Sequence, residues 1–174
     1  MKQTVPLKAV LIEGGLIVRS SGELIAGFGV RLGKVIPDER GRLGEIMRAD
    51  DPWFTKFGQV YFTTTYPGVV KAWHYHRKQF DHFYVVRGAV KVGLYDGRDD
   101  SPTRGTVCEL YVGEHCPALV RIPPGVQHGW MCVSATEAYI VNVVSEPYDP
   151  AAPDEFRTHP NDNEIPYDWT RRDG

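Results

Sequence analysis

The sequence has few cysteines and no long apolar run. Its 174 residues include three cysteines, Cys108, Cys116 and Cys132, and none of them forms a Cys-x-x-Cys pair. A set this sparse and odd in number argues against a disulfide scaffold or a zinc ribbon and favours a reducing cytoplasm. No apolar stretch approaches the ~20 residues that span a bilayer, and the first residues lack a small-residue cleavage site. We therefore expect a cytoplasmic protein with no signal peptide and no membrane partner.

An excess of charge of either sign is also missing. The formal net charge is −2 and the pI is about 6.3. A nucleic-acid binder would show a basic stripe, so nucleic acid is excluded as a partner. The length and the hydrophobic content of 42% predict one globular domain over residues 1–174 with a real core.

The apolar residues alternate with a period of two, and helical periodicity is almost absent. The clearest runs are 59–65, 83–94, 118–122 and 137–144, and two further strand-like stretches cover 7–18 and 23–35. Eighteen glycines and 13 prolines supply the turns between them. The best short helix candidate is 44–50. Many short strands with Gly/Pro turns predict an all-β sandwich or barrel.

The last segment, 148–174, is rich in proline and polar residues but carries Phe156, Tyr167 and Trp169. A disordered tail seldom contains so many aromatic residues. We therefore predict that this segment wraps along the barrel in an ordered way.

Histidines dominate the candidate chemistry. His74 and His76 are two residues apart, so on a strand they point to the same side. A second motif covers residues 123–130, in which a Pro-Pro-Gly turn places His128 at the start of a predicted strand. Buried imidazoles are costly unless they bind something. The two clusters resemble the two sequence motifs of the cupin superfamily, with Asp81 where glutamate is usual and Cys132 where asparagine is usual.

From Pro37 to Trp169 the sequence resembles the dTDP-4-dehydrorhamnose 3,5-epimerase family, which has an RmlC-like cupin fold. This resemblance implies a cupin/jelly-roll β-barrel with an N-terminal arm (1–36) and a C-terminal wrap (148–174). It also implies a homodimer in which N-terminal strands extend the partner's sheet, and a reaction without a cofactor. The matching pieces are Asp38-Glu39-Arg40-Gly41, Glu45, Gln59, Gly68 to His74, Val86-Arg87-Gly88, Asp99 to Thr103, Ile122 to Trp130, Tyr148-Asp149-Pro150, Asn161-Asp162 and Tyr167-Asp168-Trp169.

The family resemblance implies an isomerase that removes a proton next to the C4 ketone of a nucleotide-linked 4-keto-6-deoxyhexose. His74 would be the base, Asp162 the carboxylate that orients it, and Tyr148 the proton donor on the opposite face of the sugar. Epimerisation at one carbon or at both is compatible with these roles, and 3,4-keto isomerisation is a sister activity.

The same resemblance implies the substrate contacts. Residues at family positions that hold the nucleotide and diphosphate are Arg40, Glu45, Gln59 and Lys71. Residues facing the sugar would be His76, His128 and Asn142.

Several positions depart from the family pattern. Asp81 stands where the family has a lysine, and a carboxylate there would repel a developing enolate oxygen. His76 replaces a glutamine, Asn142 a tyrosine, and Lys71 an arginine. Strict alternation also places Lys71 and His74 on opposite faces of a strand. Both can serve one pocket only through a β-bulge or through a neighbouring subunit.

Two other hypotheses fit the same residues. In the first, His74, His76, Asp81 and His128 bind a metal ion and the protein is a metal-dependent cupin oxygenase or isomerase. In the second, the protein binds a sugar nucleotide and has lost its chemistry. The epimerase hypothesis assigns no metal, and metal analysis and proton exchange separate the three.

Overall fold

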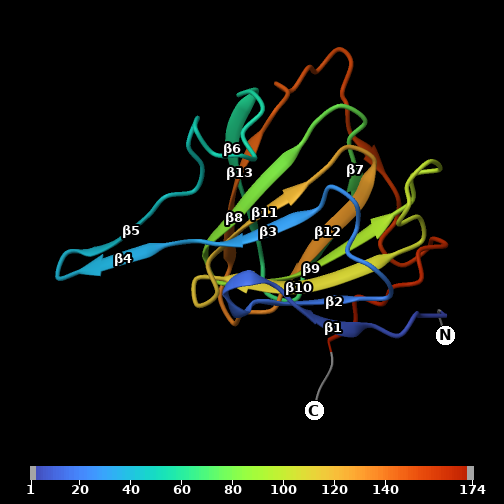
Figure 1. Cartoon of the computed structure of the whole chain (residues 1–174), viewed down its shortest axis with the longest axis horizontal. Coiled ribbons are helices and arrows are strands. Elements are labelled where there is room, and N and C mark those ends of the chain that lie inside the picture. The colour runs from blue at the N-terminus through green and yellow to red at the C-terminus, as the bar shows by residue number, and fades with distance from the viewer. Residues whose placement is uncertain (1–2, 172–174) are drawn as a thin grey trace.

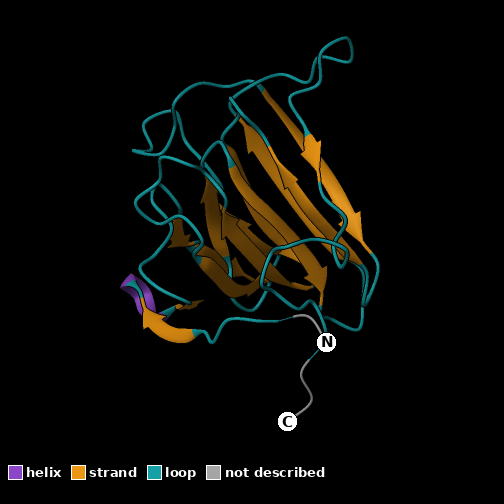
Figure 2. Cartoon of the chain, turned by 90° about the vertical axis from the view of Figure 1, so that its right-hand side faces the viewer, coloured by secondary structure: helices purple, strands orange, loops and turns teal. Residues whose placement is uncertain are grey.

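Two antiparallel sheets form the barrel of the computed structural model, which describes residues 3–171, and a third sheet of two strands stands apart from them (Figures 1 and 2). In those residues no helix is long or apolar enough to cross a membrane. The larger sheet has seven strands in the spatial order β1-β2-β10-β9-β12-β7-β14. Their bounds are β1 Lys8–Leu11, β2 Ile17–Ser20, β7 Val70–Tyr75, β9 Ala89–Asp96, β10 Val107–Gly113, β12 Val126–Cys132 and β14 Phe156–Arg157.

The second sheet has five strands in the order β3-β11-β8-β13-β6, with β6 at one edge. A short 3₁₀ turn, η1 (Glu13–Gly15), joins β1 to β2, and β4 and β5 form a separate hairpin. The remaining bounds are β3 Gly29–Leu32, β4 Val35–Asp38, β5 Gly41–Gly44, β6 Gln59–Thr65, β8 Asp81–Arg87, β11 Ala118–Ile122 and β13 Ala138–Val144. The predicted all-β jelly-roll barrel is confirmed.

The helix predicted over 44–50 is wrong. After β5 the chain runs to residue 50 without helical structure, and most of its side chains are exposed. A helix of seven residues is marginal unless an apolar face is buried, and these residues have no such face to bury.

The core lies between the two sheets and follows the alternation of the sequence. Val90, Val92 and Leu94 of β9 are fully buried and pack against Phe83 and Val85 of β8. At roughly 25 cal/mol per Å² of buried apolar area, this shared interior is the main stabilising contribution to the barrel.

The opposite face of β9 is covered by the C-terminal segment, as predicted. Tyr167 and Trp169 are buried against Trp73, with ring centroids 5.5 Å and 4.9 Å from that indole. Lys91 donates a hydrogen bond to the carbonyl of Trp169. A Cβ at Gly93 would lie 2.8 Å from the Trp169 ring, so glycine is required for this close packing. The wrap is therefore ordered through residue 171, and 172–174 fall outside the described residues.

The N-terminal strands pair within this chain. β2 pairs with β10, β1 pairs with β2, and β3 pairs with β11. The extension of a partner's sheet by such strands, which the resemblance implies, stays a prediction. The part of the chain that projects from the barrel is the β4–β5 hairpin (Figure 1).

β7 contains a β-bulge beside the histidine motif. His128 pairs with His74 and Trp130 pairs with Lys71, so β7 has one more residue than β12 in this interval. Gly129 faces the bulge, and a Cβ there would lie 2.2 Å from the Cβ of Ala72. The bulge turns Lys71 to the same side as His74, which resolves the conflict that strict alternation posed.

Candidate active site

A cavity of about 810 Å³ opens beside β6 and β7 and is closed on one side by the segment 146–160. This volume lies in the range of small-molecule sites, ~300–1,000 Å³. Its polar lining is formed by Gln59, Tyr61, Thr63, Lys71, His74, His76, Lys78, Gln79, Glu146, Tyr148, Asp149, Asp154, Glu155 and Arg157.

Three histidines meet at the inner end of this cavity. The ring centroids of His74 and His128 are 4.1 Å apart, and His76 lies 6.0 Å from each of them. One ring nitrogen from each of the three lies within 4.8 Å of the others. Neighbouring strands hold them there, because His74 on β7 is the register partner of His128 on β12.

Asp81 at the start of β8 lies behind the histidines and is almost completely buried. Its Oδ2 is 3.5 Å from Nε2 of His76 and 3.6 Å from Nε2 of His128. Its Oδ1 accepts hydrogen bonds from Gln79 Nε2 at 3.0 Å and from Asn142 Nδ2 at 2.7 Å. The carboxylate is thus held in one orientation toward the two imidazoles.

Burial and mutual repulsion keep His74 and His128 neutral. Burial lowers the pKa of His74 well below its ordinary value, and positive charge on His128 or His76 would lower it further. Burial also lowers the pKa of His128, although the Asp81 carboxylate opposes this effect. Near neutral pH, His74 is therefore an uncharged imidazole that can accept a proton.

Tyr61 is a second polar group at the cavity wall. Its hydroxyl accepts a hydrogen bond from Asn142 Nδ2 at 2.9 Å. Burial, and then the negative charge of Asp81, raise the pKa of Tyr61 to about 12. The phenol consequently stays protonated at neutral pH.

Most of the predicted site residues come together. His74, His76, Gln59, Lys71 and Tyr148 line the cavity. His128 and Asn142 lie behind that lining, in contact with His74 and Asp81 respectively.

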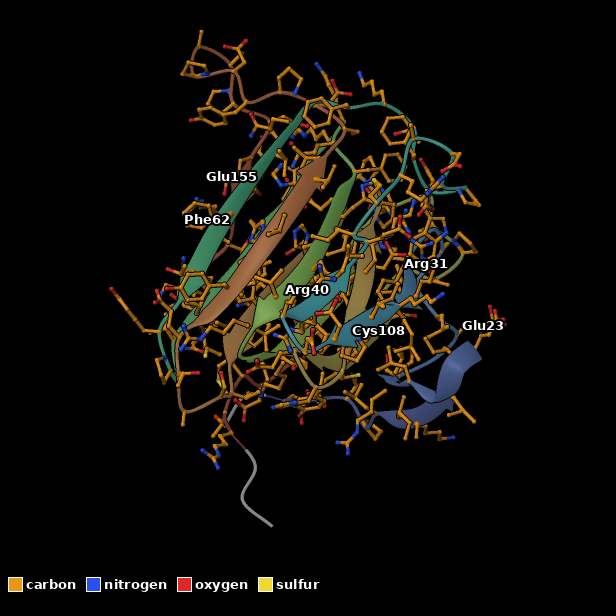
Figure 3. All side chains as sticks on the ribbon, turned by 90° about the vertical axis from the view of Figure 1, so that its left-hand side faces the viewer. Glu23, Arg31, Arg40, Phe62, Cys108 and Glu155 are labelled. Atoms are coloured by element: carbon orange, nitrogen blue, oxygen red, sulfur yellow. The ribbon has the colours of Figure 1, made fainter. Side chains whose placement is uncertain are left out.

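Arg40 and Glu45 do not line this cavity. Arg40 lies at the turn of the projecting hairpin and pairs with Asp38 at 2.6 Å (Figure 3). Glu45 follows the hairpin and pairs with Arg48 at 3.4 Å. A contact between these two residues and a nucleotide in this cavity stays a prediction.

Asp162 is exposed, and its backbone N–H donates a hydrogen bond to Nδ1 of His159 at 3.0 Å. Within residues 3–171 no hydrogen bond or ion pair joins Asp162 to His74. The dyad that the resemblance implied stays a prediction. The imidazole nearest to His74 is His128.

Sequence reasoning missed two site residues, Tyr61 and Asp154. Tyr61 alternates with Gln59 and Thr63 on β6, so the period-two pattern could have identified it. Asp154 carries no sequence signal. Its carboxylate accepts backbone N–H groups from Arg77 and Lys78, and its carbonyl contacts Nδ1 of His76.

Comparison of the sequence with known proteins identifies the family of this chain. Residues 36–156 match the family model described as polysaccharide biosynthesis C-terminal domain. The spore coat polysaccharide biosynthesis protein SpsL of Bacillus subtilis is 39% identical over 81% of this chain and 95% of its own length. A protein of Haloferax volcanii named "Probable low-salt glycan biosynthesis epimerase Agl13" is 41% identical over 78% of this chain and 83% of its own.

A solved structure shows the same relationship in its fold. The dTDP sugar isomerase from Desulfovibrio desulfuricans G20 is 33% identical, with a TM-score of 0.81 over 86% of this chain and 94% of that chain. The chain therefore belongs to the polysaccharide biosynthesis C-terminal domain family, and it is a relative of the RmlC-like dTDP-sugar epimerases that its motifs resemble.

Proposed function

We propose that this protein is a sugar-nucleotide epimerase acting on a nucleoside-diphosphate 4-keto-6-deoxyhexose. The observation that carries the proposal is His74, a neutral imidazole at the wall of a cavity large enough for such a substrate. The kinship with dTDP-sugar epimerases supports the substrate class.

The reaction needs a base and an acid on opposite faces of the sugar. The C4 ketone acidifies the C–H bonds at C3 and C5. His74 takes the proton from one of these carbons, and the electron pair of the broken C–H bond moves to the C4 oxygen as an enolate. A proton returned to the carbon from the opposite face inverts it. Tyr148 lines the cavity and is our candidate donor, because a phenol is protonated at neutral pH.

The diphosphate requires cations near the same cavity. Within residues 3–171, the cations that line it are Lys71, Lys78 and Arg157. Nζ of Lys71 donates to Thr63 Oγ1 at 3.0 Å, which holds the amine against β6. Further charge would come from Arg40 if a second subunit presents its hairpin there.

We propose a homodimer on this ground. The hairpin exposes Ile36 and Leu43, 51% and 59% accessible, and β6 exposes Val60 and Phe62, 55% and 70% accessible, at an unpaired sheet edge (Figure 3). A hairpin that reaches a partner would bury apolar surface and bring Arg40 to the partner's cavity.

Solvent exchange tests the chemistry. In D₂O the protein should incorporate deuterium at C3 or C5 of a dTDP-4-keto-6-deoxyglucose substrate, measured by NMR. His74→Asn should abolish incorporation, whereas His115→Asn, which alters an exposed histidine, should not. Nucleotide-sugar binding without exchange would instead establish a non-catalytic binder.

Subunit mixing tests the shared site. Arg40→Ala and His74→Asn variants should each have low activity, and their heterodimer should regain activity because one of its two cavities is intact.

Asp162→Asn tests whether Asp162 orients His74. Exchange that falls by less than about tenfold agrees with the separation seen here, whereas a loss of ~10⁴ would indicate an orienting carboxylate.

A further inference from the structure

Tyr61 and His74 line the same cavity from two consecutive strands, β6 and β7. The turn 66–69 reverses the chain between these strands and is closed by a backbone hydrogen bond of 3.0 Å. Nζ of Lys71 on β7 donates to Oγ1 of Thr63 on β6. Counted from that contact, His74 lies three residues further along β7 and Tyr61 lies two residues back along β6. The phenol and the candidate base therefore reach the cavity at about the same level along their strands.

The hydrogen bonds of Asn142 determine where the Tyr61 hydroxyl can point its hydrogen. Oδ1 of Asn142 accepts the backbone N–H of His82 at 3.1 Å. A backbone N–H only donates, so this contact fixes the orientation of the amide. Nδ2 then donates to Oδ1 of Asp81 at 2.7 Å and to Oη of Tyr61 at 2.9 Å. Because the phenol oxygen accepts this bond, its single O–H is left for another partner.

The cavity offers that partner a place. Within residues 3–171 no hydrogen bond leads from the Tyr61 hydroxyl to a protein acceptor, and the side chain lines the cavity. The few polar groups in the wall of a small-molecule site serve to orient the ligand. The phenol also keeps its hydrogen at neutral pH, because burial and the charge of Asp81 raise the pKa of Tyr61 to about 12. Tyr61 is thus available as a donor to an oxygen atom of the ligand.

The negative charge of Asp81 lies behind this donor. Its Oδ1 accepts hydrogen bonds from Gln79 and Asn142. Its Oδ2 faces Nε2 of His76 at 3.5 Å and Nε2 of His128 at 3.6 Å. The Asp81 side chain is 2% accessible and does not line the cavity. An oxygen of a bound sugar would therefore meet the phenol O–H before it meets the carboxylate.

We infer that Tyr61 is a catalytic residue that donates a hydrogen bond to the C4 oxygen of the sugar. This role rests on the proposed function. As His74 removes the proton from C3 or C5, the electron pair of the broken C–H bond moves to the C4 oxygen, and the phenol O–H stabilises the negative charge that develops there. The phenol hydrogen stays on Tyr61, so no other group has to restore it. Tyr148 keeps the separate task of returning a proton to carbon.

Separate rates of exchange and inversion test this role. Removal of one hydrogen-bond donor to an oxyanion lowers turnover about 100- to 1,000-fold. Tyr61→Phe should therefore slow deuterium incorporation and inversion by the same factor of about 100 or more, because both pass through the enolate. Its affinity for dTDP, measured by calorimetry, should stay within about threefold of the unmodified protein, because dTDP has no C4 ketone. Retained dTDP binding also shows that the variant is folded.

Tyr66→Phe is the matched control, because Tyr66 is 69% accessible in the turn after β6 and does not line the cavity. Both rates should be unchanged in this variant. If Tyr61→Phe exchanges within about threefold of the unmodified protein, the inference is overturned and the epimerase proposal stands. Exchange that persists while inversion is lost also contradicts it, because Tyr61 would then act as the opposite-face proton donor. No exchange by the unmodified protein removes the proposed function and the role of Tyr61 together.

Infrared spectroscopy reports the contact without turnover. His74→Asn prevents proton removal, so a substrate labelled with ¹³C at C4 can be observed while it is bound. A hydrogen bond to the ketone weakens the C=O bond, so the labelled carbonyl should absorb at a lower frequency in His74→Asn than in the double variant that also carries Tyr61→Phe. An equal frequency in the two proteins would show that Tyr61 does not touch the C4 oxygen and would overturn the inference.

Discussion

Gly129→Ala should damage both stability and activity, because the β-bulge depends on the absence of a side chain there. The new Cβ would lie 2.2 Å from Ala72 Cβ and 2.6 Å from the carbonyl oxygen of Lys71. A backbone atom cannot move aside as a flexible side chain can. Overpacking of this kind costs about 1–3 kcal/mol. With a urea m-value of about 2 kcal/mol per molar, the unfolding midpoint should fall by roughly 0.5–1.5 M.

In Gly129→Ala, the rate of deuterium exchange should fall by more than the loss of folding stability alone would cause. The displaced strand carries both Lys71 and His74, and a misplacement of about 1 Å at reacting groups can reduce turnover about 100-fold. Gly22→Ala is the matched control, because its Cβ would meet Thr106 Oγ1 at an ordinary 3.4 Å. Urea unfolding and deuterium exchange measure the two effects. A Gly129→Ala protein with the midpoint and exchange rate of the unmodified chain would refute the role assigned to the bulge.

Three other substitutions have defined outcomes. Burial raises the pKa of Asp96, but hydrogen bonds from Arg98 and the following turn outweigh it and hold the pKa below its usual value. The unfolded chain binds the proton more readily, so this stability is complete above about pH 4 and is lost as the pH falls through the folded value. Asp96→Asn should cost about 3 kcal/mol at pH 7 and flatten the acid limb of urea midpoints between pH 5 and 2. Trp169→Ala should cost about 3–5 kcal/mol in urea unfolding, because it removes the ring packed on Trp73; a smaller loss than 1 kcal/mol would mean that the tail does not stabilise the barrel. Tyr148→Phe should retain deuterium exchange but slow inversion at least about tenfold in NMR assays, and equal losses of both would exclude it as the opposite-face donor.

Much of the fold was predictable because strand alternation is a local property. The sequence run 83–94 predicts two strands around Gly88, and β8 and β9 occupy it with Val90, Val92 and Leu94 facing inward. The aromatic residues of 148–174 predict an ordered segment, and Tyr167 and Trp169 are buried in it. The helix prediction for 44–50 failed because local propensity cannot show whether a short segment has a surface to pack on.

The candidate site was predictable to a smaller extent. His74, His76 and His128 were identified from two motifs, and the bulge was required by the spacing of Lys71 and His74. Tyr61 was missed although its alternation with Gln59 pointed to the same face.

The sequence by itself determined the strands, the three histidines and the acidic residue at position 81, because alternation and motif spacing are encoded within a few residues of one another. Only the tertiary structure decided how those groups face each other. The carbonyls of Val126 and Asp154 set the tautomers of His128 and His76, and Asn142 orients Asp81. These contacts join segments as much as 78 residues apart, so no local pattern reports them. The cluster of three histidines beside Asp81 exists only once the two sheets have closed around it.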